Sequence, residues 1–262
     1  MQSYTKFSNK INSNKLFVIP IFYNEFNHYL DGDLAYIAVY ELDTHVKYLI
    51  KDVSLLYNKE IFCIDKRVLL KYKIQFLYDI NIWNYLNNKS IIKISDFYTD
   101  AHKIYYKFYQ KFAFQNIIVP KVKWLELFDN IINTIDFNSI DINRPDYVFY
   151  NNIVQNNLFL IESNGICIDP GIFSEFYDLS DWKLKNSIIY TKYNLFTTTG
   201  RPSNSFNHIN FAALNKENGC RKSIISRYYQ HGTLIEYDYS AFHIRILANI
   251  MNFNFDYNED IH

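Results

Sequence analysis

The sequence predicts an α/β fold of the α+β type, and two observations lead to it. Three apolar segments rich in β-branched and aromatic residues follow one another near the N-terminus, at residues 16–23, 35–41 and 46–50. Helical periodicity then takes over, most clearly at residues 121–137. Sequential strands followed by amphipathic helices are typical of a sheet covered by helices. With 262 residues and a hydrophobic fraction of 49%, the chain can form one large domain or two modest ones.

The first half of the chain is expected to hold these three strands and two helices. Residues 16–23 are almost wholly apolar, which indicates a buried strand. A helix is expected from Lys66 to Lys73, because Asp65 stands in the N-cap position before it. The helix over 121–137 is expected because its apolar residues fall at helical spacing, namely Trp124, Leu127, Phe128, Ile131, Ile132 and Ile135.

A polar segment at residues 138–145 marks an expected domain boundary. A helix over 153–163 should follow, stopped by a left-handed residue at Gly165, and another should run over about 172–188. A strand ending at Asp238 should then lead into a helix with one buried apolar face, formed by Ile244, Leu247, Ala248 and Met251 at the spacing i, i+3, i+4, i+7. The expected parts are a polar tail (1–15), a first domain (16–145), a short helical part (146–192) and a last part (193–262).

The composition indicates whether the chain resembles nucleic-acid-binding, zinc-binding, secreted or membrane proteins. Lys plus Arg and Asp plus Glu both number 27, so the chain lacks the overall basic charge of many nucleic-acid binders, although a few well-placed cations suffice for backbone contact. The three cysteines are isolated, which favours free thiols in a reducing compartment over a structural zinc site. Residues 1–15 hold no apolar run of signal-peptide length, and no segment approaches a membrane span. We therefore expect a soluble cytoplasmic protein with no membrane partner.

Asp238 is the first candidate for catalytic chemistry. Phosphoryl transfer on nucleic acids uses two divalent metal ions held by carboxylates that converge on one site. Asp238 stands at an expected strand end with a helix directly after it, which suits such a ligand. A strand-terminal Asp is also a common helix N-cap, so this residue alone is a weak signal.

Two segments around Asp238 carry a family resemblance. Thr-Thr-Thr-Gly-Arg-Pro-Ser-Asn at residues 197–204 and Glu-Tyr-Asp-Tyr-Ser-Ala-Phe-His-Ile-Arg at residues 236–245 resemble the palm of a family A (DNA polymerase I-like) DNA polymerase. The resemblance implies that Asp238 binds two Mg²⁺ ions, that the Tyr239 carbonyl completes one coordination sphere, and that Arg245 helps to place the primer end. His243 stands where the family has a Glu that excludes the ribose 2′-hydroxyl, so the sugar-gate position departs from the family pattern.

The same resemblance assigns residues to primer and template. Thr199-Gly200-Arg201, with Asn207 and Asn210 after it, is similar to the segments that line the duplex minor groove, where acceptors occur at every base pair. Arg221 and Lys222 are similar to a basic pair that would meet phosphates. Residues 152–169 resemble the opening of the thumb, and the short stretch between them and the palm implies a much reduced thumb.

The first domain resembles a degenerate RNase H-like 3′–5′ exonuclease. Asp65 and the residues after it resemble the helix of the second exonuclease motif. Glu25 can stand for the Glu of the first motif, but Tyr23 replaces its Asp, and no Tyr-x-x-x-Asp occurs around 98–114. The resemblance therefore implies an exonuclease-like fold in which Glu25 and Asp65 are vestiges and hydrolysis is lost.

The expected function is DNA-templated DNA synthesis by the N-terminal part of a polymerase of phage or viral type, in the host cytoplasm. Its expected partners are primer–template DNA, a deoxynucleoside triphosphate and a second polypeptide with the fingers and the remaining metal-binding carboxylate; an incomplete reading frame is the other explanation of the chain's end. The alternative function is a non-catalytic DNA-binding or replisome scaffold. An active exonuclease is a third option, and it would require the missing carboxylates.

Overall fold

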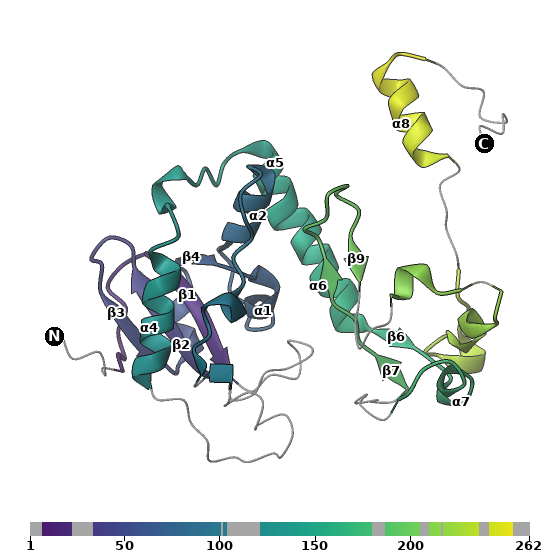
Figure 1. Ribbon diagram of the computed structural model, residues 1–262, viewed down its shortest axis with the longest axis horizontal. Coiled ribbons are helices and arrows are strands. Elements are labelled where there is room, and N and C mark those ends of the chain that lie inside the picture. The colour runs from purple at the N-terminus through teal and green to yellow at the C-terminus, as the bar shows by residue number, and fades with distance from the viewer. Residues whose placement is uncertain are drawn as a thin grey trace.

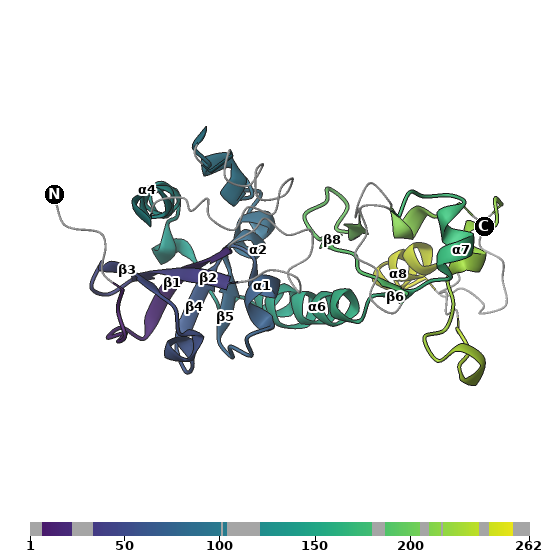
Figure 2. The same ribbon diagram turned by 90° about the horizontal axis from the view of Figure 1, so that it is seen from below.

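The computed structural model describes residues 7–22, 34–100, 102–103, 121–179, 187–204, 210–215, 217–235 and 241–253. It is a mixed α/β structure in which a five-stranded sheet with its helices lies at one end (Figure 1). A long helical segment connects this sheet to a smaller C-terminal part, and both views show the same elongated arrangement (Figures 1 and 2). The expected fold class is confirmed at this level.

The sheet combines an antiparallel meander with two parallel strands. Its strands are β1 (Lys15–Phe22), β2 (Leu34–Glu41), β3 (Lys47–Ile50), β4 (Glu60–Cys63) and β5 (Leu77–Asp79), in the spatial order β3-β2-β1-β4-β5. β1 pairs antiparallel with β2, β2 pairs antiparallel with β3, and β4 runs parallel to both β1 and β5. The three expected strands are confirmed, whereas β4 and β5 were not among them.

Alternate residues of β1 face two different cores. Phe17 and Ile19 pack beneath α4 (Lys121–Ile132), where the rings of Phe17 and Phe128 stack 5.4 Å apart between their centroids. Leu16 and Val18 face the other core, which Leu69 of α1 (Lys66–Leu70) and Leu56 of a 3₁₀ turn help to fill. This alternation follows from the two-residue period of a strand, and Figure 2 shows α4 over one side of the sheet.

One continuous helical segment leads from the sheet to the C-terminal part. It comprises α5 (Pro145–Val148), the π-helical η4 (Phe149–Val154) and α6 (Gln155–Asn164). α2 (Ile80–Leu86) packs against α5, and α1 packs against α6. The predicted stop is confirmed: Gly165 has a φ of 64°, and its N–H donates to the Ile161 carbonyl.

The C-terminal part is built from short elements. β6 (Ile166–Cys167) pairs with β7 (Ile188–Ile189), and β8 (Tyr193–Asn194) pairs with β9 (Ser203–Asn204). A small core joins α7 (Pro170–Ser174) to two 3₁₀ turns, η5 (Phe211–Ala213) and η6 (Cys220–Ser223). α8 (Phe242–Ile250) follows. The three cysteines are buried free thiols. No helix in the described ranges is long and apolar enough to cross a membrane.

Three helix predictions were wrong in extent. Of the helix expected over 172–188, the described helix α7 ends at Ser174, and residues 180–186 lie outside the described ranges. Ile188 belongs to β7, where it pairs with Cys167, and Ile189 lies in the small core. The helix expected over 121–137 ends at Ile132, because Asp136 caps a new 3₁₀ turn (Phe137–Ser139) through the Asn138 N–H. The α1 helix also stops early, at Leu70 rather than Lys73.

The buried face predicted for the last helix is mostly exposed. Ala248 is buried, but Ile244, Leu247 and Met251 are 39%, 57% and 75% exposed. The helical spacing is confirmed, but nothing among the described residues covers the face. The strand expected before this helix, ending at Asp238, lies outside the described residues.

Candidate functional site

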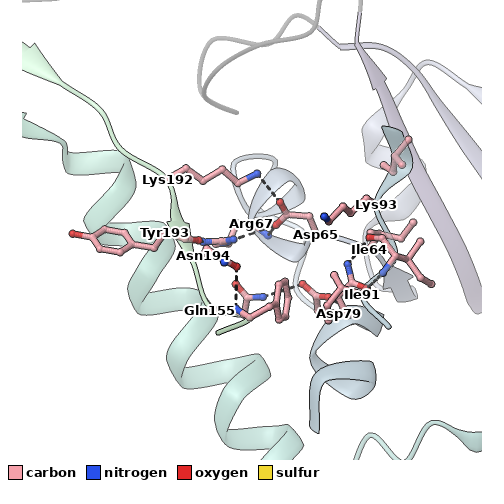
Figure 3. A pocket seen from close by; sticks show the side chains of 14 residues that line it. Ile64, Asp65, Arg67, Asp79, Ile91, Lys93, Gln155, Lys192, Tyr193 and Asn194 are labelled. Carbon is pink, nitrogen blue, oxygen red and sulfur yellow. Dashed lines mark hydrogen bonds and ion pairs between the residues drawn. The ribbon is translucent and has the colours of Figure 1, made fainter. Parts of the chain in front are cut away.

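Two carboxylates meet at the carboxyl ends of β4 and β5. Cys63 at the end of β4 lies beside Asp79 at the end of β5, and Asp65 follows β4 by two residues. Because the strands are parallel, both side chains project from the same edge of the sheet. They line a cavity of about 430 Å³ (Figure 3). This edge is where open α/β sheets commonly bind ligands.

Asp79 is buried and saturated with hydrogen bonds. Its carboxylate caps α2 by accepting from the Asn81 N–H at 2.8 Å, and it accepts from the Lys66 N–H and from Gln155 Nε2 at 3.0 Å each. Burial and the neighbouring charge of Asp65 together raise the pKa of Asp79 to about 7. The side chain therefore ties α1, α2 and α6 together and titrates near neutral pH.

Asp65 is held by two cations instead of facing an open site. Its carboxylate caps α1 through the Arg67 N–H, accepts from Lys192 Nζ at 2.9 Å, and lies 3.6 Å from Arg67 Nε. Burial alone would raise the pKa of Asp65, but the charges of Lys192 and Arg67 outweigh it and hold that pKa well below its usual range. Figure 3 shows Lys93 pointing toward Asp65 from the opposite wall of the cavity. The predicted N-cap role of Asp65 is confirmed.

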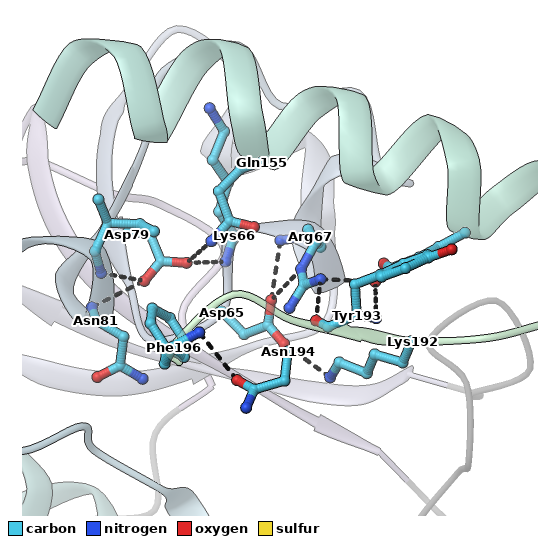
Figure 4. A network of polar contacts seen from close by, with 12 residues as sticks. Asp65, Lys66, Arg67, Asp79, Asn81, Gln155, Lys192, Tyr193, Asn194 and Phe196 are labelled. Carbon is cyan, nitrogen blue, oxygen red and sulfur yellow. Dashed lines mark hydrogen bonds and ion pairs between the residues drawn. The ribbon is translucent and has the colours of Figure 1, made fainter. Parts of the chain in front are cut away.

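A fully buried ion pair lies behind Asp65. Arg67 Nη1 donates to Glu162 Oε1 at 2.7 Å, and both side chains are excluded from solvent. Arg67 Nη1 also donates to the Tyr193 carbonyl at 2.8 Å, while the Tyr193 N–H donates to Glu162 Oε1. The pair therefore hydrogen-bonds both the carbonyl and the N–H of Tyr193 in β8. Figure 4 shows α6 crossing over this network. α1, α6 and β8 are joined by charged hydrogen bonds.

These contacts leave little capacity for a metal ion at Asp65. Its two oxygens already bond an ammonium, a backbone N–H and the edge of a guanidinium. Among the residues that the structure describes, no group of three or more His, Cys, Asp or Glu side chains is placed to hold a metal. A Mg²⁺ ion does not fit Asp65 in this arrangement, because the cations beside it already offset its charge.

The strands β8 and β9 form a hairpin that presents the Thr-Gly-Arg sequence. Leu195, just after β8, is buried against Ile82 of α2, Tyr147 of α5 and Leu158 of α6. The tip turns at Gly200, whose φ is 72° and whose N–H donates to the Thr197 carbonyl at 3.2 Å. Arg201 follows this turn and is exposed. The hairpin therefore has a buried base and a basic tip.

The remaining sequence-predicted residues lie on neighbouring elements or outside the described residues. β9 lies beside η5, and η5 shares the small core with η6. Asn210 is exposed directly before η5. In η6, Arg221 and Lys222 are exposed as well. Arg221 Nε donates to the Leu214 carbonyl, which orients its side chain. η5 and η6 therefore lie next to β9, the strand that follows the turn bearing Arg201.

Other predicted site residues are only partly described or are not described. Arg245 and His243 are on α8, and the side chain of His243 is not described. Four predicted residues lie outside the described ranges, namely Asp238, Tyr239, Asn207 and Glu25. Their predicted roles stay predictions.

Apart from Asp65, sequence reasoning missed the residues that build the network. Asp79 could have been found, because an Asp before the helical pattern of residues 80–86 is an N-cap signal. Glu162 and Lys192 carry no such signal, since their partners are more than 90 residues away in sequence. A scan of protein-family models finds no match for this sequence, and a search of curated proteins finds none. A functional assignment therefore rests on motifs and geometry.

Proposed function

We propose that this chain belongs to a family A DNA polymerase and contributes to DNA-templated DNA synthesis. The observation that carries the proposal is the hairpin tip, where a hydrogen-bonded turn from Thr197 to Gly200 is followed by the exposed Arg201. In the family that the sequence resembles, this motif contacts the primer–template duplex. An exposed Arg on a braced turn is suited to the phosphates or groove edge of DNA.

Exposed polar and basic residues on the elements next to β9 support the same proposal. Asn210 is exposed directly before η5, and Arg221 and Lys222 are exposed on η6. η5 contacts β9, and it shares a small core with η6. Cations on one region attract a phosphate backbone even where the net charge of the chain is zero, because the contact is local. These residues would hold duplex DNA without reading its sequence.

The sheet supports an exonuclease-like ancestry for the first domain. The order β3-β2-β1-β4-β5, with an antiparallel meander followed by two strands parallel to β1, is the strand order of RNase H-like domains. Asp65 after β4 is the residue that the sequence assigns to the second exonuclease motif. A shared strand order supports a shared fold and leaves activity to be argued from the site.

The site favours a scaffold role for this domain over hydrolysis. Two-metal hydrolysis needs several carboxylates converging on open coordination positions. Here Asp65 is bonded by Lys192 and Arg67, and Asp79 is buried as a helix cap. We infer that the carboxylates of this domain no longer bind metal and instead make contacts that hold α6 and β8 in place.

Metal-dependent synthesis is assigned to residues that the structure does not describe. Asp238 and the Tyr239 carbonyl would hold Mg²⁺, and the family pattern adds a second carboxylate and groups that bind the triphosphate. His243 would stand beside the incoming sugar. Mg²⁺ would offset the charge that develops on the transferred phosphate.

Primer extension tests the assignment. The chain is assayed with Mg²⁺ and four deoxynucleotides, alone and mixed with the product of the adjacent downstream reading frame. We expect synthesis in the mixture, and its loss in Asp238→Ala with duplex affinity unchanged. Synthesis that persists in Asp238→Ala would overturn the motif assignment. Duplex binding with no synthesis in either sample would favour the alternative, a non-catalytic DNA-binding scaffold.

Nuclease assays test the inactive domain separately. We expect Mg²⁺-dependent degradation of 3′-labelled single-stranded DNA by the wild type to equal that by Asp65→Ala. Degradation that is lost in Asp65→Ala would revive the active-exonuclease hypothesis. Lys192→Met is a useful companion variant, since it removes the cation that occupies the carboxylate while leaving Asp65 in place.

A further inference from the structure

Tyr85 joins the first domain to the tip of the β8–β9 hairpin. It is the penultimate residue of α2, and its hydroxyl donates to the Thr197 carbonyl at 2.9 Å. The same carbonyl accepts the Gly200 N–H that closes the turn. One hydrogen bond from α2 therefore reaches the peptide group that defines the turn before Arg201.

The ring of Tyr85 also supports the hairpin. It meets Phe196 edge to face at 5.7 Å between ring centroids, and it meets Tyr150 of η4 at 6.3 Å. A methyl group on Gly200 would lie 3.6 Å from the Tyr85 hydroxyl oxygen. The turn thus rests directly on a tyrosine that belongs to the first domain.

The base of the hairpin is fixed by contacts that do not involve Tyr85. Leu195 is buried between α2, α5 and α6, and the Tyr193 peptide groups are bonded by Arg67 and Glu162. Within the tip, Thr197 Oγ1 donates to the Arg201 carbonyl at 2.8 Å. Removing the Tyr85 hydroxyl should therefore loosen the tip and leave the base in place.

We propose that Tyr85 is a positioning residue for nucleic-acid binding, which holds the Thr197–Gly200 turn so that Arg201 faces the DNA. This inference rests on the proposed function, because it takes duplex DNA as the ligand of the hairpin. The physical reason is preorganisation. A turn that is already ordered before binding loses less conformational entropy when a phosphate or base edge meets its side chain. The first domain would then contribute to DNA binding without touching DNA.

The test measures the affinity of the full chain for a primer–template duplex by fluorescence anisotropy at fixed salt. Tyr85→Phe removes only the hydroxyl, and we expect affinity to fall about two- to tenfold, the loss typical of one hydrogen bond. Arg201→Ala provides the reference loss. The double variant should bind no more weakly than Arg201→Ala alone, because Tyr85 acts through Arg201. Tyr57→Phe, an exposed tyrosine after the 3₁₀ turn η1 (Val53–Leu56), is the matched control and should bind like the wild type.

The outcomes separate the inference from the proposed function. If Arg201→Ala weakens binding but Tyr85→Phe does not, the positioning role of Tyr85 is overturned, while the hairpin remains assigned to DNA binding. If the losses of the two variants are additive, Tyr85 acts independently of Arg201 and the inference is likewise overturned. If Arg201→Ala binds like the wild type, the hairpin is no DNA surface and both fail. Thermal unfolding of each variant shows that the compared samples are folded.

Discussion

Asp79 connects β5 to three helices through a single buried carboxylate. Within the described part of the chain its hydrogen-bond donors are neutral N–H groups, from the backbone and from one amide side chain. None of these donors is a cation, and the nearby charge of Asp65 opposes the ionisation of Asp79. The protein therefore holds a carboxyl group whose ionised form is disfavoured in the folded state, unlike that of Asp65.

Asp79 makes stability fall as pH rises. Its pKa is raised from 3.8 to about 7, so its contribution is fully present below the unfolded value and is lost as pH rises through 7. Between pH 5 and pH 8 the unfolding free energy of the wild type should fall relative to that of Asp79→Asn by about 2–3 kcal/mol. Urea denaturation at both pH values measures this. Asp65 stays ionised over that range, since its pKa is lowered. A difference that does not change with pH would contradict the prediction.

The Arg67–Glu162 pair should matter far more than a surface pair. Arg67→Met leaves the Glu162 carboxylate buried without its cation, and we expect a loss of about 3–5 kcal/mol in unfolding free energy. Lys15→Met removes an exposed pair with Glu60 and should cost about 0–1 kcal/mol. Urea denaturation of the two variants provides the comparison. Equal losses would mean that burial of the pair is energetically unimportant.

At the scale of elements, the end of α6 depends on one glycine. A Cβ on Gly165 would lie 2.6 Å from Ile188 Cγ2 and 2.7 Å from the Ile189 carbonyl, and the residue also has a positive φ. Gly219 has a φ of 85°, but a Cβ there would meet no described atom within 4 Å. We expect Gly219→Ala to cost about 1 kcal/mol from backbone strain and Gly165→Ala about 3 kcal/mol, since overpacking adds to the strain. Thermal and urea unfolding measure the stability of both variants. Similar losses in unfolding free energy would show that β7 shifts to accommodate the added Cβ at little cost.

Predictions of helices and strands succeeded where a run of several neighbouring residues carries the signal. β1 to β3 and the stop at Gly165 follow from apolar runs and turn chemistry. β4 and β5 were missed because strands of four and three residues give almost no periodicity. The end of the helix expected over 172–188 was wrong, because Ile188 pairs with β6, and strand pairing depends on tertiary context rather than on local helical preference.

At the scale of the molecule, Leu195 joins the hairpin to the first half of the chain. It is 1% exposed among side chains of α2, α5 and α6, whereas Leu160 on the outer face of α6 is 56% exposed. We expect Leu195→Ala to cost about 2–5 kcal/mol and Leu160→Ala less than about 1 kcal/mol. Hydrogen exchange of the β8 and β9 amides should rise only in Leu195→Ala. Unchanged protection there would show that the ion-pair network alone holds the hairpin.

The apolar face of α8 presents a different situation. Its larger side chains remain exposed among the described residues, although the helix has the spacing of a buried one. Helical period is a local property, whereas burial requires another surface to pack against.

The sequence by itself determined the fold class, the first three strands, the cap at Asp65 and the Thr-Gly-Arg motif, because each depends on neighbours within a few residues. Tertiary structure decided what those residues do. It placed Lys192 on Asp65, Glu162 on Arg67 and Tyr85 beneath Thr197, pairs separated by 127, 95 and 112 positions. Such pairs leave no periodic trace in a sequence, since their spacing is set by how the chain folds back on itself. The physical reason is that charge pairing and burial act through space, while propensity and capping act along the chain.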